Sequence, residues 1–443
     1  MKKQNGVITE IANLKIRIRN LIEEGSITEG ILALEEYEQV MPEDIDIYSM
    51  KAVIMILNND WENAEIELLK GLKVDSNNFD ILFNLGYLSE FKGQLPTSQN
   101  YYLKAGSLSN NLDQSNEVSE ALTRLTEKYT DSVDLKKLVF FVKAGMDSFL
   151  DSVIKELSSN FITKKVVVSH NKQIEENLKW CDIAWFEWCD ELISYGSNHS
   201  LAKNKKIICR LHSYEAFTDY INHIRWESVD KVIFVAEHIR RYVLQQQKSL
   251  ELEQTIVIPN GVDVTSHGFK DRERGFKIAY VGYINYKKGP MMLLHSFKAI
   301  HDMDIRYKLY IAGQFQDPRY ALYFNQMIEE LGLKGSIIYE GWQGNIEKWL
   351  EDKNYILSTS LLESQSMSLM EAMVKGIKPL IHNFVGAREI YPSSYIWNTM
   401  DEVTKMVKSN SYNSTEYRKY IVENYSLKHR ISQINCLLLQ ILL

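Results

Sequence analysis

The sequence is poor in cysteine. Its 443 residues include four, Cys181, Cys189, Cys209 and Cys436. No two of them form a Cys-x-x-Cys pair, which argues against a structural zinc site or a redox motif. We therefore expect reduced and mostly buried thiols, as in a protein of the cytoplasm.

An excess of positive charge and long apolar segments are also absent. The net charge is 51 − 58 = −7, which argues against nucleic acid or an anionic membrane as the main partner. No stretch approaches the length of a transmembrane helix. The first residues, MKKQNGVITEIANL, contain lysines but no apolar core, so we expect no signal peptide and a cytoplasmic location.

Residues 1–130 have the apolar spacing of helices throughout. Gly25, Asp60 and Gly93 interrupt the pattern at intervals of 60 − 25 = 35 and 93 − 60 = 33 residues. Their mean is the period of a tetratricopeptide (TPR) repeat, so this part is predicted to be an all-α, TPR-like domain. A helical bundle without repeats is the alternative.

Short apolar runs alternate with helical segments over the rest of the chain, which is typical of α/β domains with parallel sheets. The alternation falls into two series, divided near residues 260–274. The expected organisation is a helical domain at 1–130, a first α/β domain at 137–268, a second at 269–423, and a last helical segment at 424–443.

Residues 355–391 read as one strand–loop–helix–strand unit of the second series. Glu363 lies in the loop, and Glu371 lies about one turn inside the helix, 371 − 363 = 8 residues later. The amides at the start of that helix favour an anion such as phosphate, and ligands of parallel sheets bind at the carboxyl ends of strands. Carboxylates suit sugar hydroxyls, so the pattern indicates a nucleotide-sugar.

In this context Glu-x7-Glu resembles the donor-site motif of family 4 retaining glycosyltransferases, which have the GT-B fold. The following GIKPLIHNFVGAREIY and the earlier Ile-Pro-Asn-Gly-Val-Asp at 258–263 are similar to segments of bacterial members. The resemblance implies two Rossmann-like domains that face each other across a donor cleft. It also implies transfer of a sugar from a nucleotide-sugar, such as a UDP-sugar, with retention of anomeric configuration.

The resemblance also implies the site residues. Those with catalytic roles would be Glu363, His212 and Lys288. The donor would be bound by Gly282, Tyr283, Lys288, Gly313, Gly341, Trp342, Ser364, Gln365, Ser366, Met367, Ser368 and Glu371. The acceptor or the loop over it would involve Gly145, Tyr214 and Glu215.

Several of these positions leave alternatives open. The family usually has an arginine where this chain has Tyr283, so one diphosphate-binding cation is missing. Lys287 either compensates for it or is a solvated loop charge. Trp342 either lies beside the base or packs in the core. The Asp-x-Asp of residues 302–304 resembles a metal motif of another glycosyltransferase fold and is interpreted as coincidence, so neither a metal nor another cofactor is expected.

Two functions are compatible with these features. The first is a metal-independent, retaining hexosyltransferase whose helical repeats either recruit a protein acceptor or form a homodimer. The second is a non-catalytic scaffold with a degenerate glycosyltransferase domain. For the enzyme we expect Glu363 and Lys288 to be exposed to the cleft.

Overall fold

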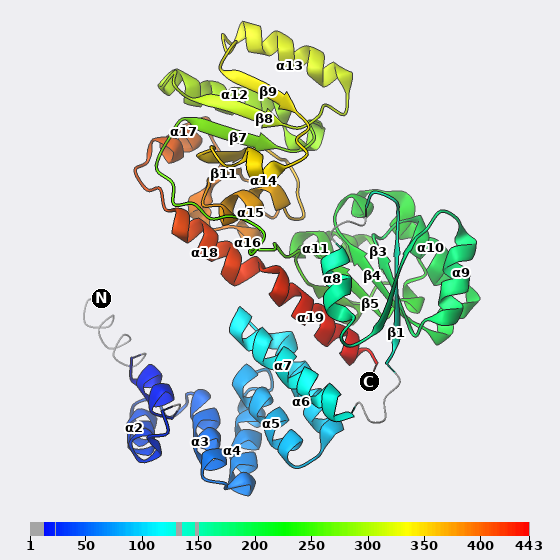
Figure 1. Ribbon diagram of the computed structural model, residues 1–443, viewed down its shortest axis with the longest axis vertical. Coiled ribbons are helices and arrows are strands. Elements are labelled where there is room, and N and C mark those ends of the chain that lie inside the picture. Colours follow the sequence, from blue (N-terminus) through cyan, green and yellow to red (C-terminus); the bar gives the residue numbers. More distant parts are fainter. Residues whose placement is uncertain (1–12, 23, 130–134, 147–149, 443) are drawn as a thin grey trace. The chain divides into compact units, whose positions relative to one another are not determined.

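The computed structural model describes residues 13–22, 24–129, 135–146 and 150–442 (Figure 1). The chain divides into two compact units, Met1–Asp134 with Ser432–Leu443, and Leu135–Ile431. Residues 130–134, which join the predicted helical domain to the first α/β domain, and the amino-terminal segment 1–12 lie outside the described residues.

The first unit is all-helical, as predicted. After a helix at residues 13–22 its helices are α2 (Ile27–Val40), α3 (Asp46–Leu57), α4 (Trp61–Val74), α5 (Phe79–Phe91), α6 (Leu95–Leu108) and α7 (Leu112–Tyr129). Gly25 and Gly93 have positive φ angles, and Asp60 caps α4 by accepting a hydrogen bond from the amide of Asn63. The three punctuating residues therefore end or begin helices, and the TPR period remains a prediction.

Close helix packing holds this unit together. A Cβ atom on Gly86 would lie 2.7 Å from the ring of Tyr102, so the glycine lets α5 approach α6. Cys436 is buried in the same cluster, and the hydroxyl of Ser432 donates to the carbonyl of Ser115 over 2.9 Å. The carboxyl-terminal residues are therefore part of the core of the helical unit.

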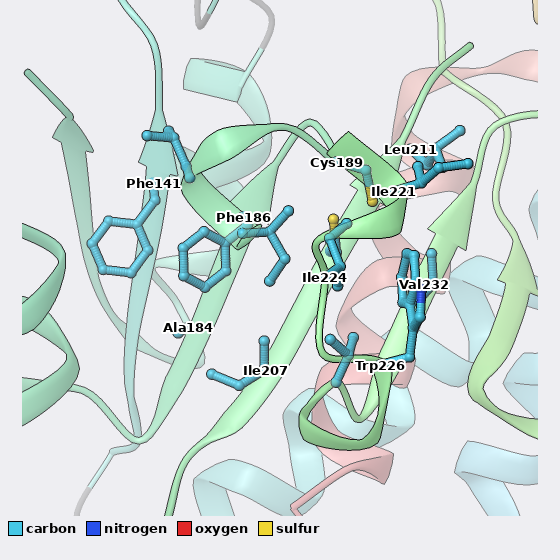
Figure 2. Packing of buried hydrophobic residues seen from close by; sticks show 14 of the residues in the cluster. Phe141, Ala184, Phe186, Cys189, Ile207, Leu211, Ile221, Ile224, Trp226 and Val232 are labelled. Carbon is cyan, nitrogen blue, oxygen red and sulfur yellow. The ribbon is translucent and has the colours of Figure 1, made fainter. Parts of the chain in front are cut away.

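The second unit contains two separate parallel sheets. The first has the order β2-β1-β3-β4-β5-β6. Its strands are β1 (Lys137–Val142), β2 (Ile162–Val167), β3 (Ile183–Glu187), β4 (Lys206–Leu211), β5 (Lys231–Phe234) and β6 (Thr255–Val257), with helices α8 (Leu150–Leu157), α9 (Asn171–Trp180), α10 (Glu191–Asn198) and α11 (Glu237–Gln246). Figure 2 shows side chains of its core, among them Phe141, Phe186 and Trp226.

The second sheet has the order β12-β11-β10-β7-β8-β9. Its strands are β7 (Lys277–Val281), β8 (Lys308–Ala312), β9 (Ile337–Gly341), β10 (Tyr355–Ser358), β11 (Lys378–His382) and β12 (Ile396–Trp397). The helices are α12 (Pro290–Met303), α13 (Pro318–Glu330), α14 (Ile346–Trp349), α15 (Met367–Val374), α16 (Ala387–Ile390), α17 (Met400–Lys408) and α18 (Ser414–Tyr425). The last helix, α19 (Leu427–Gln440), belongs to the helical unit from Ser432 onward. Two separate sheets after a helical region confirm the predicted GT-B architecture.

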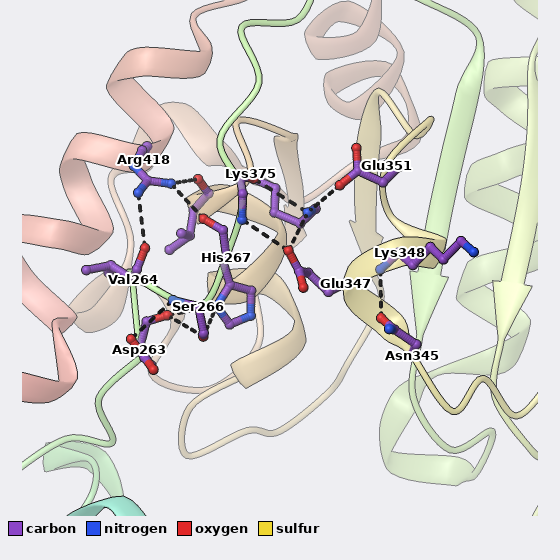
Figure 3. Close-up of polar contacts among 12 residues, drawn as sticks. Asp263, Val264, Ser266, His267, Asn345, Glu347, Lys348, Glu351, Lys375 and Arg418 are labelled. Atoms are coloured by element: carbon purple, nitrogen blue, oxygen red, sulfur yellow. Dashed lines mark hydrogen bonds and ion pairs between the residues drawn. The ribbon is translucent and has the colours of Figure 1, made fainter.

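The segment that connects the two sheets is fixed to the second one. Arg418 donates hydrogen bonds to the carbonyls of Val264 and His267, over 3.1 and 3.3 Å (Figure 3). Lys375 is fully buried, and its Nζ donates to the carbonyl of Gly268 in the connecting segment over 3.5 Å. These contacts give the connection a defined path beside α15, which carries Glu371.

Within the described residues, no helix is both long enough and apolar enough to cross a membrane.

Candidate active site

The predicted donor loop lies at the carboxyl edge of the second sheet. It follows β10, and Ser366 precedes the first residue of α15. A pocket opens there between β7, β10 and the start of α15. Its walls are formed by Tyr280, Val281, Lys288, Ile356, Leu357, Ser358, Ser360, Ser366, Ser368 and Leu369. One ammonium group and four serine hydroxyls beside a helix amino terminus form a setting that favours an anion.

Lys288 and Glu363 form an ion pair in this site. Lys288 Nζ lies 2.5 Å from Oε1 of Glu363, and the Ser360 hydroxyl donates to the same oxygen over 2.8 Å. Lys287 Nζ lies 3.9 Å from the other oxygen, Oε2. The residue Glu363 is only 5% exposed, so the expectation of an exposed carboxylate is wrong. Burial is tolerated because the charge is paired and hydrogen-bonded.

The loop that carries the lysines is held on both sides. The side chain of Asn285 accepts a hydrogen bond from the amide of Lys288 over 3.2 Å. The carbonyl of Lys288 accepts one from the hydroxyl of Thr359 over 2.9 Å, and the carbonyl of Lys287 accepts the amide of Leu361 over 2.8 Å. These hydrogen bonds therefore fix the backbone positions from which the Lys287 and Lys288 side chains extend.

Glu371 lies in the second turn of α15. Burial raises the pKa of its carboxyl group above the ordinary 4.5, and the nearby His267 opposes this shift. The ionised carboxylate is thus poorly solvated, which makes it a strong acceptor for incoming hydroxyl groups.

The three glycines predicted to bind the donor, Gly282, Gly313 and Gly341, are required for different structural reasons. A Cβ atom on Gly313 would lie 2.0 Å from the carbonyl oxygen of Gly282, so the ends of β7 and β8 approach too closely for a side chain. Gly282 and Gly341 have positive φ angles, 140° and 68°. Around Gly341 nothing lies within 4 Å of an added Cβ, which leaves that turn open to solvent.

Tyr283 and Trp342 form an aromatic pair beside these glycines. Their ring centroids are 5.1 Å apart with an interplanar angle of 32°. Tyr283 is 44% exposed and Trp342 is 62% exposed. This exposure excludes the alternative in which Trp342 packs in the core, and it leaves two aromatic faces available at the edge of the site.

His212 lies just past β4, at the carboxyl edge of the first sheet. Its Nε2 is 2.6 Å from Oε1 of Glu187, a fully buried carboxylate that also accepts the indole N–H of Trp185 over 2.7 Å. The His212 ring packs against Trp188 at a centroid distance of 4.0 Å. Sequence reasoning missed Glu187, which orients the predicted histidine.

Glu215 does not lie where an acceptor could reach it. It is fully buried, and its two oxygens accept the backbone amides of Cys189, His212 and Ser213 over 3.3, 3.1 and 2.9 Å. This carboxylate therefore shapes the loop that carries His212, in place of the acceptor contact proposed for it. Tyr214, the next residue in the loop, is 36% exposed. Gly145 has a φ of 76° in an open turn after β1.

Gln365, expected to bind the donor, has its side-chain amide engaged by the backbone. Its Oε1 accepts the amide of Asn260 over 2.7 Å, and its Nε2 donates to the carbonyl of Asn260 over 2.8 Å. Arg210 donates to the side chain of Asn260 over 2.6 Å. Asn260 belongs to the Ile-Pro-Asn-Gly-Val-Asp segment at 258–263, but no sequence pattern indicates that Gln365 is the residue that binds it.

The Asp-x-Asp segment forms only local ion pairs. Asp302 pairs with Lys298, four residues earlier, and Asp304 pairs with Arg306 over 2.7 Å. Among the residues that the structure describes, no three His, Cys, Asp or Glu side chains are grouped so that they could hold a metal ion.

Comparison with known proteins agrees with this architecture. The family model described as glycosyl transferases group 1 matches residues 266–396, which contain the second sheet from β7 onward. No curated protein matches the chain.

Solved structures share the fold at low sequence identity. HepE of Anabaena, solved with UDP, is 13% identical; the match covers 69% of this chain and 100% of that one, with a TM-score of 0.57. A glycosyltransferase of Rickettsia africae is 15% identical, with 70% and 99% covered and a TM-score of 0.54. TarM of S. aureus is 19% identical, with a TM-score of 0.48. That match covers 57% of this chain and 54% of TarM, so this chain spans about half of the length of TarM. The family match, together with the fold shared with HepE and the Rickettsia africae protein, supports a GT-B glycosyltransferase.

Proposed function

We propose that this protein transfers a sugar from a nucleotide-sugar to an acceptor. The observation that carries the proposal is the Lys288–Glu363 ion pair, which lies beside the amino terminus of α15 at the carboxyl ends of β7 and β10. A cation, a carboxylate and a helix amino terminus within one small site suit a diphosphate that is joined to a polyol.

Each part of the donor then has a partner. The diphosphate binds Lys288 and the hydroxyls and amides at the start of α15, which stabilise the charge that develops on it as the sugar leaves. Glu363 accepts hydroxyls of the sugar, and Glu371 accepts the ribose hydroxyls. The base lies against Tyr283 and Trp342, whose exposed rings offer a stacking surface; UDP is the proposed nucleotide.

The stereochemical outcome is proposed to be retention, as in the family that the donor loop resembles. His212, held by Glu187, faces the sugar from the first sheet. Lys288 and the α15 amides supply the positive charge that a divalent metal supplies in other glycosyltransferases, so the reaction is proposed to be independent of metal.

The helical unit is proposed to recruit a protein acceptor in the cytoplasm. Tyr87 and Phe91 lie one turn apart on α5 and are 41% and 58% exposed, and the Phe91 ring stacks on Trp61 at 3.9 Å. Exposed aromatic side chains are common in protein interfaces. Deletion of residues 1–130 would uncover Cys436 and its neighbours, so surface substitutions are the cleaner test.

The double variant Tyr87→Ser/Phe91→Ser tests this recruitment. It should keep donor hydrolysis and lose transfer to the protein acceptor. Unchanged protein modification would contradict recruitment by this face, and a shift to a smaller species in size-exclusion chromatography would indicate a dimer interface.

Donor hydrolysis by the purified protein tests the enzyme itself. We expect release of nucleoside diphosphate from at least one nucleotide-sugar, and loss of that release in Lys288→Ala. The non-catalytic scaffold stays the second candidate because Tyr283 replaces the expected arginine. A protein that neither binds nor turns over any nucleotide-sugar would favour the scaffold.

A further inference from the structure

The residue after Gly282 carries no charge in this chain. Tyr283 instead turns its ring toward Trp342, at 5.1 Å between centroids, on the β9 side of the site. Without an arginine at this position, Lys288 supplies one positive charge to a donor diphosphate that carries about two negative charges.

Lys287 lies where a second positive charge could contact the diphosphate. Its carbonyl accepts the amide of Leu361 over 2.8 Å, which ties the short helical turn Tyr286–Lys288 to the loop after β10. Its Nζ lies 3.9 Å from Oε2 of Glu363, while the preceding Tyr286 is 72% exposed. Lys287 is thus directed to the site carboxylate, unlike a solvated loop charge.

The charges of this cluster leave a surplus for an anion. Lys287 and Lys288 carry two positive charges, and Glu363 carries one negative charge, so one positive charge is uncompensated. The two ammonium groups contact different oxygens of Glu363, Oε2 and Oε1. They therefore flank the carboxylate from two sides, as two cations would flank adjacent phosphate groups.

We propose that Lys287 is a second diphosphate-binding residue, which supplies from the lysine loop the charge that Tyr283 does not supply. This inference rests on the proposed function. It assigns two tasks to two neighbouring segments: Tyr283 and Trp342 face the base, and Lys287 and Lys288 hold the diphosphate.

Binding of UDP and of uridine separates a phosphate contact from a general disturbance. We expect Lys287→Ala to weaken UDP binding about ten-fold in calorimetry, the loss of one charged hydrogen bond. Uridine binding, followed by ligand-observed NMR, should stay unchanged because uridine has no phosphate. The double variant Lys287→Ala/Tyr283→Arg returns a cation next to Gly282 but removes one ring from the base surface, so it should bind uridine more weakly while its ratio of UDP affinity to uridine affinity rises again above that of Lys287→Ala.

Lys334→Ala is the matched control. Lys334 is a highly exposed lysine at the turn before β9 that pairs with Glu329, and its removal should leave UDP affinity unchanged. Lys287→Gln, which keeps most of the side-chain length, replaces the alanine variant if that one unfolds.

Three results would overturn the inference: unchanged UDP affinity in Lys287→Ala, an equal loss of uridine affinity, or an equal loss in Lys334→Ala. Failure of the wild-type protein to bind UDP would instead contradict the UDP-dependent function. The wild-type measurement therefore distinguishes an error in the proposed function from an error in the role of Lys287.

Discussion

Lys288 Nζ lies 2.5 Å from Glu363 Oε1, although the two residues are 363 − 288 = 75 positions apart. The contact joins the lysine loop after β7 to the donor loop after β10. Each charge offsets the cost of burying the other. A diphosphate would compete with Glu363 for the same ammonium group, so donor binding must redistribute charge at this pair.

Glu363→Gln tests the role of the carboxylate charge. Glutamine keeps an acceptor for the Ser360 hydroxyl but removes the negative charge. We expect turnover to fall by ~10²–10³, as for other preorganised electrostatic groups, while UDP affinity is kept or increases because Lys288 is no longer neutralised. Calorimetry and a product assay on one preparation measure both. Wild-type turnover at saturating donor would show that Glu363 has no role in the reaction.

Glu371→Gln should stabilise the protein and weaken donor binding. Because burial raises the pKa of Glu371 above 4.5, its ionisation opposes folding. The stability that Glu371 contributes below pH 4.5 is therefore lost as the pH rises through its raised pKa. The variant should unfold at a higher temperature than wild type at pH 7, with the difference vanishing below pH 4.5. Loss of a charged hydrogen bond to ribose should weaken UDP binding by ~10–100-fold.

Glu330→Gln is the control for this pair of effects, since Glu330 is an exposed carboxylate at the end of α13. It should change neither melting temperature nor UDP affinity. A Glu371→Gln protein that binds UDP like wild type would contradict the ribose assignment.

Gly313→Ala should damage the donor site through the backbone. The new Cβ atom would lie 2.0 Å from the Gly282 carbonyl, so β7 and β8 must move apart at their carboxyl ends. We expect a loss of roughly 2–4 kcal/mol in the free energy of unfolding and weaker UDP binding. Chemical denaturation measures the first. Gly344→Ala, with nothing within 4 Å of its Cβ, should be close to neutral; equal effects of the two would refute the steric explanation.

Sequence reasoning predicted the fold better than the contacts within the site. The alternation of apolar runs and helices predicted two parallel sheets, and the strand–loop–helix–strand unit predicted at residues 355–391 is formed by β10, α15 and β11. The two-residue β12 and the largely exposed β2 cannot be delimited from the sequence, because strands this short or this exposed have little hydrophobic pattern.

The contacts between side chains of the site could not be predicted from the sequence, for a different reason. Pairs such as Lys288–Glu363 and Gln365–Asn260 join segments 75 and 105 residues apart, and periodicity describes only near neighbours. The burial of Glu215 was missed in the same way. A carboxylate after a strand looks like a ligand group until its three amide donors are seen.

His429 should make the protein less stable in acid. It is 4% exposed, and burial lowers the pKa of its imidazole to about 4 from the ordinary 6.5. A lowered pKa means that the stability present above pH 6.5 is lost as the pH falls toward 4, by up to about 3 kcal/mol. Burial lowers the pKa of His238 as well, with the same sign.

His429→Phe should therefore lose less stability than wild type between pH 6.5 and pH 4, as measured by urea denaturation. His295→Phe, at an exposed position of α12, should follow the wild-type curve. Parallel curves for His429→Phe and wild type would contradict the assignment of acid sensitivity to this residue.

The most direct test of the proposed function is release of UDP from a panel of UDP-sugars by the full-length protein, compared with Lys288→Ala. The proposed function predicts steady UDP release from at least one donor by the wild-type protein, and a decrease of ~10²-fold or more in the variant. Equal release by both proteins, or none from any UDP-sugar, would contradict it.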